Sequence, residues 1–388
     1  MTADIPHDII EEARQWRHDL HRHPEIAYQE FRTSAFVAGK LAEFGYEVHR
    51  GLGGTGVVGT LRRGASSQSI ALRADMDALP IQEQTGASYA SIVPGMMHAC
   101  GHDGHTAMLL AAARYAATRK DLDGVLHVIF QPAEEVEGGA RKMIEDGLFD
   151  QISPDRIFGL HNWPDTLPGT VAALDGAMMS AFGTFDITVT GKSAHGAMPH
   201  QSADPIVAAS QIVSALQVIA ARNVSPLDSV VVSVTKMHGG HAYNVIPDAI
   251  HLAGTTRWFT AAGVELIERR LGEVAQHVAM AFECRAEVAH QRRYPATIND
   301  VAAAAFVREI AAEAGFEIVS VPPSMGAEDF SFMMERKRGC YFWLGAGKEG
   351  PNPMLHSPHF DFNDAVLGDG IRLWNQLIGA ALPKAIVP

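Results

Sequence analysis

The chain has 388 residues, of which 47% are hydrophobic and 19% are charged, and its formal net charge is −13 at pH 7. This length and composition are typical of a globular protein with two domains and a large buried core. The negative charge argues against nucleic acid or an anionic membrane as the main partner. No apolar run has the length expected of a bilayer span, and the polar start is not that of a signal peptide. Three cysteines predict no disulfide framework, so we expect a protein of the reducing cytoplasm.

Helices and strands are expected to alternate over the first 180 residues. Apolar residues at helical spacing predict helices at 8–20, 33–44 and 106–117. Compact apolar or β-branched runs predict strands at 57–61, 69–74, 125–130 and 157–160. Polar groups recur where these strands end, which is where open α/β sheets place their active sites. His21 and His23 follow the first helix, and we expect both to be solvated.

Residues 51–56 read GLGGTG and satisfy the pattern G-x-G-x-x-G of dinucleotide-binding folds. In those folds the motif opens a helix, whose N-terminus holds the pyrophosphate. Here the β-branched segment 57–61 follows instead. The glycines are therefore expected to form a turn rather than a nucleotide site.

A different pattern runs from residue 181 to residue 292. Strands are predicted at 185–190, 230–236, 249–256 and 284–289, and helices at 204–222 and 264–282. The order β-α-β-β-α-β is that of a split ferredoxin-like domain. A helix, a strand and a helix then follow at 301–314, 341–344 and 363–381. We therefore predict an α/β catalytic domain built from residues 1–180 and 293–388, with a smaller domain, residues 181–292, inserted into it.

Residues 98–105 read HACGHDGH, which places three imidazoles, one thiol and one carboxylate in a short segment. Cysteine and histidine are ligands that late first-row divalent metals prefer. Cys100 and His102 are two residues apart, so on an extended or turning backbone they project to the same side and can share a metal. The alternative is a loop that is rich in histidine by chance, because the chain holds 19 histidines.

Further candidate ligands stand at strand ends or in loops of the predicted catalytic domain. The full candidate set is Cys100, His102, Glu135, His161 and His356. Five ligands exceed the needs of one tetrahedral site, but they suit two cations that lie about 3.5–4 Å apart and share a bridging group. A thiolate can bridge as well as bind, so Cys100 is the candidate for the shared ligand.

Glu134 directly precedes Glu135, just after the predicted strand at 125–130. If the pair sits in a turn, one carboxylate can bind metal while its neighbour faces the bound water. A carboxylate in that position accepts the proton of the water and later hands it to a leaving amine. The alternative is two solvated glutamates in an acidic stretch. The position at a strand end favours the chemical role.

The chain resembles the M20 metallopeptidase family in four motifs. They are HACGHDGH at 98–105, QPAEE at 131–135, GLH at 159–161 and GAEDF at 326–330. The resemblance covers essentially the whole chain, and the closest branch is that of the N-acyl amino acid amidohydrolases, which includes hippurate hydrolases and auxin-conjugate hydrolases. It implies a zinc-peptidase-like catalytic domain, a dinuclear site held by the five candidate ligands, Glu134 as general base, and an inserted lid or dimerisation domain.

One position departs from the wider family. Many M20 enzymes carry His-x-Asp, with the histidine as a metal ligand, where this chain reads DMD at 75–77. The resemblance implies that Cys100 and His102 replace the missing ligand, as in the amidohydrolase branch. Asp77 either orients a ligand from behind or is a structural aspartate at a strand end.

The resemblance extends into the inserted domain. The motifs there are GKSAHGAMPH at 191–200, AYNVIP at 242–247 and GTTR at 254–257. They imply that His195 reaches the active site of the partner subunit and stabilises the oxyanion. They also imply that Asn244 and Arg257 hold the free carboxylate of the substrate, a task that suits the planar fork of an arginine. From the residues alone, each of the three is an ordinary surface polar residue.

These features predict a metal-dependent amidohydrolase that cleaves N-acyl amino acids of the hippurate type into a carboxylic acid and a free amino acid. Two divalent cations are expected in each subunit, zinc by default and manganese, cobalt or nickel otherwise. The resemblance also implies a homodimer or a higher homo-oligomer formed through the inserted domain. A dipeptidase or carboxypeptidase of the same family is one alternative, and a catalytically silent metal-binding or ligand-binding protein is another. The acyl group, the amino acid and the native metal are left open.

Overall fold

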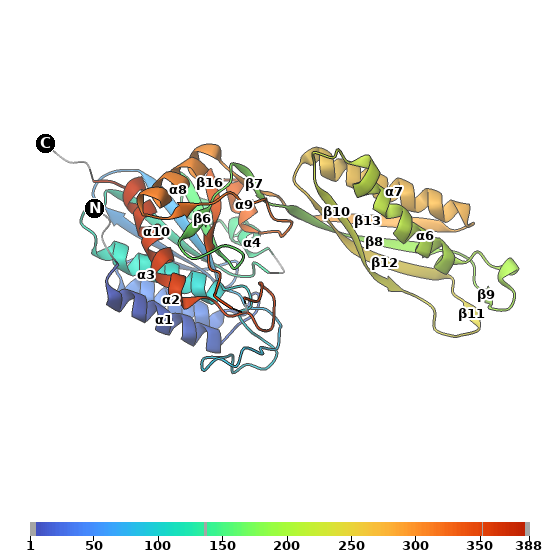
Figure 1. Cartoon of the computed structure of the whole chain (residues 1–388), viewed down its shortest axis with the longest axis horizontal. Helices are drawn as coiled ribbons and strands as arrows, with labels where there is room; N and C mark the ends of the chain where they lie inside the picture. Colours follow the sequence, from blue (N-terminus) through green and yellow to red (C-terminus); the bar gives the residue numbers. More distant parts are fainter. Residues whose placement is uncertain (1–4, 136–137, 351, 385–388) are drawn as a thin grey trace. The chain divides into compact units, whose positions relative to one another are not determined.

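The computed structural model describes residues 5–135, 138–350 and 352–384. These residues form two compact units (Figure 1). Unit 1 comprises the described parts of residues 1–178, 297–323 and 329–388, and unit 2 comprises residues 179–296 and 324–328. The segment 324–328 joins unit 2 because the backbone N–H of Ser180 donates to Ser324 and Gly326 carbonyls, each at 3.0 Å.

Unit 1 is built on an eight-stranded sheet. In spatial order its strands are β1 (Glu47–Leu52), β2 (Gly56–Arg63), β4 (Gly124–Gln131), β3 (Ser69–Asp75), β5 (Arg156–Trp163), β16 (Gly339–Gly345), β6 (Thr170–Ala172) and β15 (Glu317–Ile318). The central strands β4, β3, β5 and β16 are parallel to one another. They are almost entirely buried, which explains their continuous apolar sequences. Because they are parallel, their carboxyl ends meet at one edge of the sheet.

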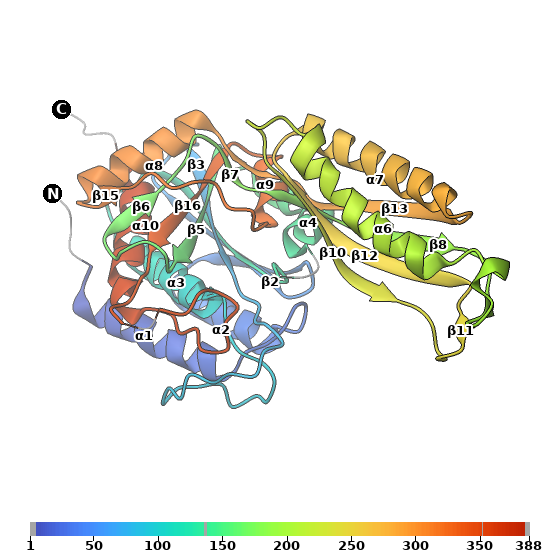
Figure 2. The same ribbon diagram turned by 45° about the vertical axis from the view of Figure 1, so that its right-hand side comes forward.

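Helices cover this sheet. They are α1 (His7–Arg22), α2 (Phe31–Glu43), α3 (His102–Thr118), α4 (Gly139–Glu145), α5 (Leu148–Gln151), α8 (Val301–Glu313), α9 (Phe330–Met334) and α10 (Leu367–Ala381). Helix α3 contacts α1, α10 and strand β3, so it is buried on nearly every side (Figure 2). Its many alanines allow this close approach. Helix α3 therefore places its first residues inside the protein, directly beside the sheet.

The glycine-rich segment at 51–56 connects β1 to β2, which pair antiparallel. Gly53 and Gly54 both have positive φ, which few other residues adopt at low cost. The prediction of a turn at this segment is confirmed.

Unit 2 has an antiparallel sheet of four strands. In spatial order they are β10 (Val230–His238), β12 (Ala249–Trp258), β8 (Ala181–Thr190) and β13 (Arg285–Tyr294). Helices α6 (Pro205–Val218) and α7 (Ala261–Ala281) pack on this sheet (Figure 1). The order along the chain is β-α-β-β-α-β, as the residue pattern predicts, and the α/β class of the protein is confirmed. A short ribbon of unit 2 pairs β9 (Ala194–His195) with β11 (Val245–Ile246). A separate ribbon, which pairs β7 (Gly176–Met179) with β14 (Thr297–Asn299), lies in unit 1 except for Met179.

One helix, Pro205–Asn223, is long and apolar enough to cross a membrane by length and composition alone, with a mean hydropathy of 1.3. By that criterion the expectation that no apolar run reaches this length is wrong. Core helices of soluble proteins pass the same test. Here Ala208, Ile212 and Leu216 are buried in the core of unit 2.

Candidate metal centre

The carboxyl edge of the central strands brings the predicted ligands together. Glu135 follows β4, His161 lies near the end of β5, and His356 lies in the loop after β16. Cys100 and His102 flank Gly101, whose φ is +94°, and a Cβ there would lie 2.3 Å from Asn162 Oδ1. Only glycine fits at this turn. His102 is the first residue of α3 rather than part of a loop, so the helix begins four residues before the predicted start.

The ligand atoms form two groups of three. Within each group the atoms lie no more than 4.8 Å apart, and the groups are Cys100, His102, His161 and Cys100, Glu135, His356. Cys100 belongs to both, which is the position expected of a shared ligand. Its Sγ lies 3.4 Å from His161 Nε2, and Glu135 Oε1 lies 3.2 Å from His356 Nε2.

The His356 backbone is in the left-handed region, with φ +66°, and its N–H donates to the Ala99 carbonyl at 2.8 Å. This bond ties the His356 loop to the segment that carries Cys100. The His356 side chain is 53% exposed, whereas His102 and His161 are buried. The cluster therefore has one accessible side.

The donor set fits a pair of divalent cations. Among the described residues, His102 Nε2 is a buried atom without a hydrogen-bond partner. Buried polar atoms are rarely left in this state, because the loss of hydration is costly. A cation bound by His102 Nε2 removes that cost. The sulfur, nitrogen and oxygen donors of the candidate set together suit zinc and its neighbours in the first transition row.

The charges around the cluster also favour a bound cation. Burial by itself lowers the pKa of His102, but Asp75 and Asp77 raise it to about 10. Burial raises the pKa of the Cys100 thiol, and the nearby carboxylates of Glu135 and Glu134 raise it further. The protein thus concentrates negative charge around the cluster, and a bound cation neutralises it.

Hydrogen bonds fix the ring nitrogen that each buried imidazole presents. His102 Nδ1 donates to the Asp77 carbonyl at 2.9 Å, and His161 Nδ1 donates to the Asn162 carbonyl at 2.7 Å. Each Nε2 is therefore left to face the cluster. Asp77 also accepts the Glu135 N–H on Oδ2 at 3.0 Å. Asp77 thus orients two candidate ligands rather than serving only the strand.

His105 is a supporting residue that the residue pattern did not assign. It lies one helical turn after His102 on α3, and its Nδ1 donates to Asp75 Oδ1 at 2.6 Å. Its Nε2 lies 2.6 Å from Asn162 Oδ1 and 3.0 Å from the Asn162 backbone nitrogen. Asp75 in turn accepts from the buried guanidinium of Arg73 at 2.7 Å. The available signal was the i, i+3 spacing from His102, which places both imidazoles on one face of a helix.

The expectation that His21 is solvated is wrong. His21 is fully buried, with Nδ1 at 2.8 Å from Asp103 Oδ2 and Nε2 at 3.3 Å from Glu83 Oε1. Burial lowers the pKa of His21, but Asp103 and Glu83 outweigh it and raise the pKa to about 9. The packing of α1 against α3 brings these charges together. His23 is half-buried and donates from Nδ1 to the Asp19 carbonyl at 2.8 Å.

Glu134 is buried beside the cluster rather than solvated. It forms a further group with His102 and Glu135, whose ligand atoms all lie within 4.8 Å of one another. The preceding residue, Ala133, is buried and has φ +53°. This conformation costs about 1–3 kcal/mol for a residue with a side chain, and such strain collects at functional sites. The turn therefore points Glu134 toward the candidate ligands at an energetic cost.

The predicted substrate residues lie at two ends of unit 2. Val245 pairs with His195, and the Gly196 N–H donates to the Asn244 carbonyl at 2.7 Å, so His195 and Asn244 are neighbours. Arg257 lies on β12. That strand begins at Ala249, at the end nearer to β11, and Arg257 lies eight residues further along it. At about 3.3 Å per residue, Arg257 therefore lies about 26 Å along the sheet from Ala249. Within one copy of unit 2, Asn244 and Arg257 do not converge.

Arg257 is held in place by its own unit. Its Nε donates to the Met325 carbonyl at 3.2 Å, and its guanidinium carbon lies 4.8 Å from the centre of the Phe182 ring. Burial lowers the pKa of Arg257. His195 and Asn244 are exposed.

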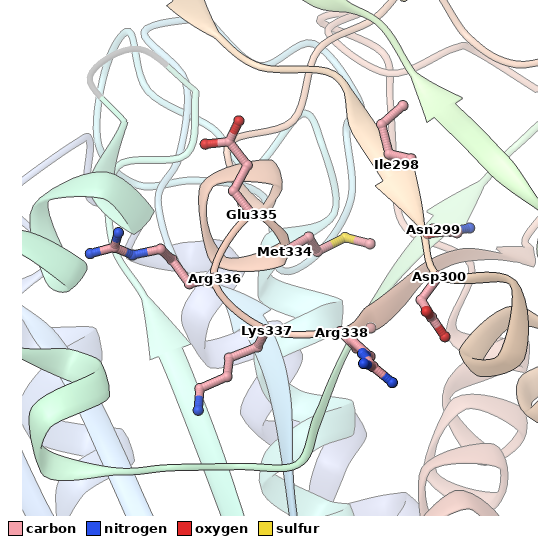
Figure 3. Close-up of a pocket in the computed structure, with 9 residues that line it drawn as sticks. Ile298, Asn299, Asp300, Met334, Glu335, Arg336, Lys337 and Arg338 are labelled. Carbon is pink, nitrogen blue, oxygen red and sulfur yellow. The ribbon is translucent and has the colours of Figure 1, made fainter.

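A hollow of about 310 Å³ in unit 1 lies between β14 and the segment that follows α9. Arg336, Lys337 and Arg338 lie at its rim and point in different directions (Figure 3). Their charges do not converge on one anion, and none of the candidate ligands lines this hollow.

Buried thiol, imidazole and carboxylate groups at the edge of a parallel sheet, with a separate carboxylate beside them, are the arrangement of a metal-dependent hydrolase. Residues 71–380 match the model of the peptidase family M20/M25/M40. The chain is 41% identical to a hippurate hydrolase of Campylobacter jejuni, covering 95% of this chain and 96% of the relative. It is 40% identical to an N-acetyl-L-cysteine deacetylase of Bacillus subtilis, covering 90% and 83%.

A solved structure agrees with these relatives. The YXEP protein of Bacillus subtilis, a dinuclear metal-binding peptidase of the M20 family, matches with a TM-score of 0.85 and 33% identity, over 98% of this chain and all of that one. The chain therefore belongs to peptidase family M20 and to its amidohydrolase branch. It is an enzyme, and the reading as a catalytically silent binding protein is set aside.

Proposed function

We propose that the enzyme hydrolyses the amide bond of N-acyl amino acids of the hippurate type and releases a carboxylic acid and a free amino acid. The observation that carries this proposal is the position of Glu134, a buried carboxylate next to two groups of candidate ligands that share Cys100. The names of the relatives, a hippurate hydrolase and an N-acetyl-L-cysteine deacetylase, support the same substrate class.

Each residue of the cluster has a distinct part in this proposal. Two divalent cations, with zinc the first candidate, would be held by Cys100, His102, Glu135, His161 and His356, and they would polarise the amide carbonyl and make water acidic. Glu134 accepts the proton of the attacking water on its carboxylate and returns it to the leaving nitrogen. Asp77 holds His102 and Glu135 in the orientation that this reaction requires.

Unit 2 would act as a lid and dimerisation domain, and the active enzyme would be a homodimer in the cytoplasm. His195 would stabilise the oxyanion, and Asn244 and Arg257 would bind the substrate carboxylate. Arg257 lies about 26 Å along β12 from Ala249, and Asn244 lies beyond that end of the strand, next to β11. Asn244 and Arg257 would therefore serve one substrate only if they came from different copies of the chain. If Arg257 serves the site of its own subunit, His195 and Asn244 would act on the site of the partner subunit.

The test is a hydrolysis screen over a panel of N-acyl amino acids, run together with metal analysis. We expect an aromatic N-acyl glycine to be cleaved far faster than a dipeptide with a free amino group. Preference for the dipeptide would instead identify a dipeptidase with the same metal chemistry. Cleavage of neither class would refute the proposed substrate.

A further inference from the structure

The turn that carries Glu134 needs support from outside itself. Ala133 is buried and has a left-handed backbone with φ +53°, which residues with a side chain rarely adopt. Such a conformation persists only where the surrounding structure holds it. The atoms that bind the Ala133 peptide therefore hold the backbone from which Glu134 extends.

Glu30 supplies that support. Its Oε1 accepts the Ala133 N–H at 2.9 Å, across 103 residues of sequence. On the other side of the turn, the Ala133 carbonyl accepts the Gly139 N–H at 3.0 Å. Glu30 is fully buried and lies directly before α2, so it joins the start of that helix to the turn after β4.

Both oxygens of Glu30 are engaged. Oε2 accepts a hydrogen bond from Thr55 Oγ1 at 2.5 Å, and Thr55 lies in the turn between β1 and β2. Over residues 5–135, 138–350 and 352–384, no arginine, lysine or histidine forms an ion pair with Glu30. Burial raises the pKa of Glu30 to about 7, against the effect of the Thr55 hydrogen bond. Burying a carboxyl group without a countercharge lowers the stability of the fold, because the group loses its hydration. The presence of Glu30 at this position therefore suggests a role in function rather than in stability.

We propose that Glu30 is a positioning residue for the hydrolytic reaction: through the Ala133 N–H, it fixes the direction of the Glu134 carboxylate. This inference rests on the proposed function. Glu135, the next residue, has its own anchor, because its N–H donates to Asp77 Oδ2 at 3.0 Å. Glu30 thus serves the base, while Asp77 serves the ligand.

The first test compares Glu30→Ala with Glu30→Gln. Loss of the hydrogen bond in Glu30→Ala lets the turn relax, and a misplacement of about 1 Å is expected to lower kcat by about 10–100-fold. KM should stay within about threefold, because the ground-state contacts remain. Metal content should also be unchanged. Glu30→Gln keeps an acceptor for Ala133 and should restore most of kcat, whereas a variant as slow as Glu30→Ala would overturn the proposal.

Glu25→Ala is the matched control. Glu25 accepts the Arg32 and Thr33 N–H groups at 2.9 and 2.8 Å, so it supports the same helix without touching Ala133. We expect this variant to keep the kcat of the wild type. If it loses as much kcat as Glu30→Ala, the loss comes from helix α2 and the proposal fails.

A double variant shows whether Glu30 acts through the base. When Glu30→Ala is added to Glu134→Gln, the residual rate should not fall further, because the group being positioned is already disabled. If Glu30→Ala lowers kcat in the Glu134→Gln background by the same factor as it does in the wild-type enzyme, the inference is overturned. If Glu134→Gln alone keeps the rate of the wild type, the proposed base is wrong, and this result is distinct from a failure that concerns Glu30.

Discussion

His21 is expected to make the stability of this protein depend on pH above neutrality. The imidazole is fully buried between Asp103 and Glu83, with nitrogen–oxygen distances of 2.8 and 3.3 Å. Burial and the charge of Arg17 lower its pKa, but the two carboxylates outweigh them and raise it to about 9. His21 is therefore positively charged in the folded protein at neutral pH.

The sign and size of the effect follow from this difference. The pKa of His21 in the folded state lies above its ordinary value of 6.5, so its contribution is complete below pH 6.5 and is lost as the pH rises through about 9. Each unit of difference between the folded and unfolded pKa values is worth about 1.4 kcal/mol. The raised pKa of His21 therefore contributes about 3 kcal/mol to the free energy of unfolding.

Urea unfolding of the wild type and of His21→Gln, at about pH 6.5 and about pH 9.5, measures this contribution. The wild type should lose about 3 kcal/mol more than His21→Gln between the two pH values. His23→Gln is the control, because His23 is half-buried and bonds to the Asp19 carbonyl. The free energy of unfolding of His23→Gln should change between the two pH values as much as that of the wild type. If the difference in free energy of unfolding between the wild type and His21→Gln is the same at both pH values, the reasoning is refuted.

Four further predictions concern the site and the core. Glu134→Gln should keep its metal but lose about 10²–10⁴-fold in kcat, as measured by metal analysis and steady-state kinetics. A chelator should abolish activity, and added divalent metal should restore it. Chains with His195→Ala and with Arg257→Ala should each be inactive alone, whereas co-expression should regain about a quarter of the sites if His195 acts on the partner subunit. Gly104→Ala places a Cβ 2.3 Å from the Phe362 ring and should lower the free energy of unfolding by about 1–3 kcal/mol, as read from urea titration.

Much of the architecture could be predicted from local patterns. The apolar runs of β3, β4 and β5 predict buried strands, and the β-α-β-β-α-β order of unit 2 follows from the alternation of its segments. Cys100 and His102 could be paired because they are two residues apart, and Glu134 stands out because it adjoins Glu135 at a strand end. In each case the relevant neighbours are close in sequence, or the period of the backbone determines which way a side chain points.

Other features depended on contacts between distant segments. His21 has the local sequence of a solvated helix end, yet the packing of α1 on α3 buries it against Asp103, 82 residues away. Nothing near Glu30 signals that its carboxylate holds the Ala133 turn. The separation of Asn244 from Arg257 depends on the pairing of β11 with β9 and on the length of β12.

The sequence by itself determined the class of fold, the chemical types of the candidate ligands and the adjacency of Glu134 and Glu135, because these depend on residue type and short-range spacing. Only the tertiary structure decided which atoms share a space around Cys100, which imidazole nitrogens face inward, and which buried charges support them. Those properties arise from distances between residues far apart in the chain, and the free energy of a buried charge depends on all of its neighbours at once.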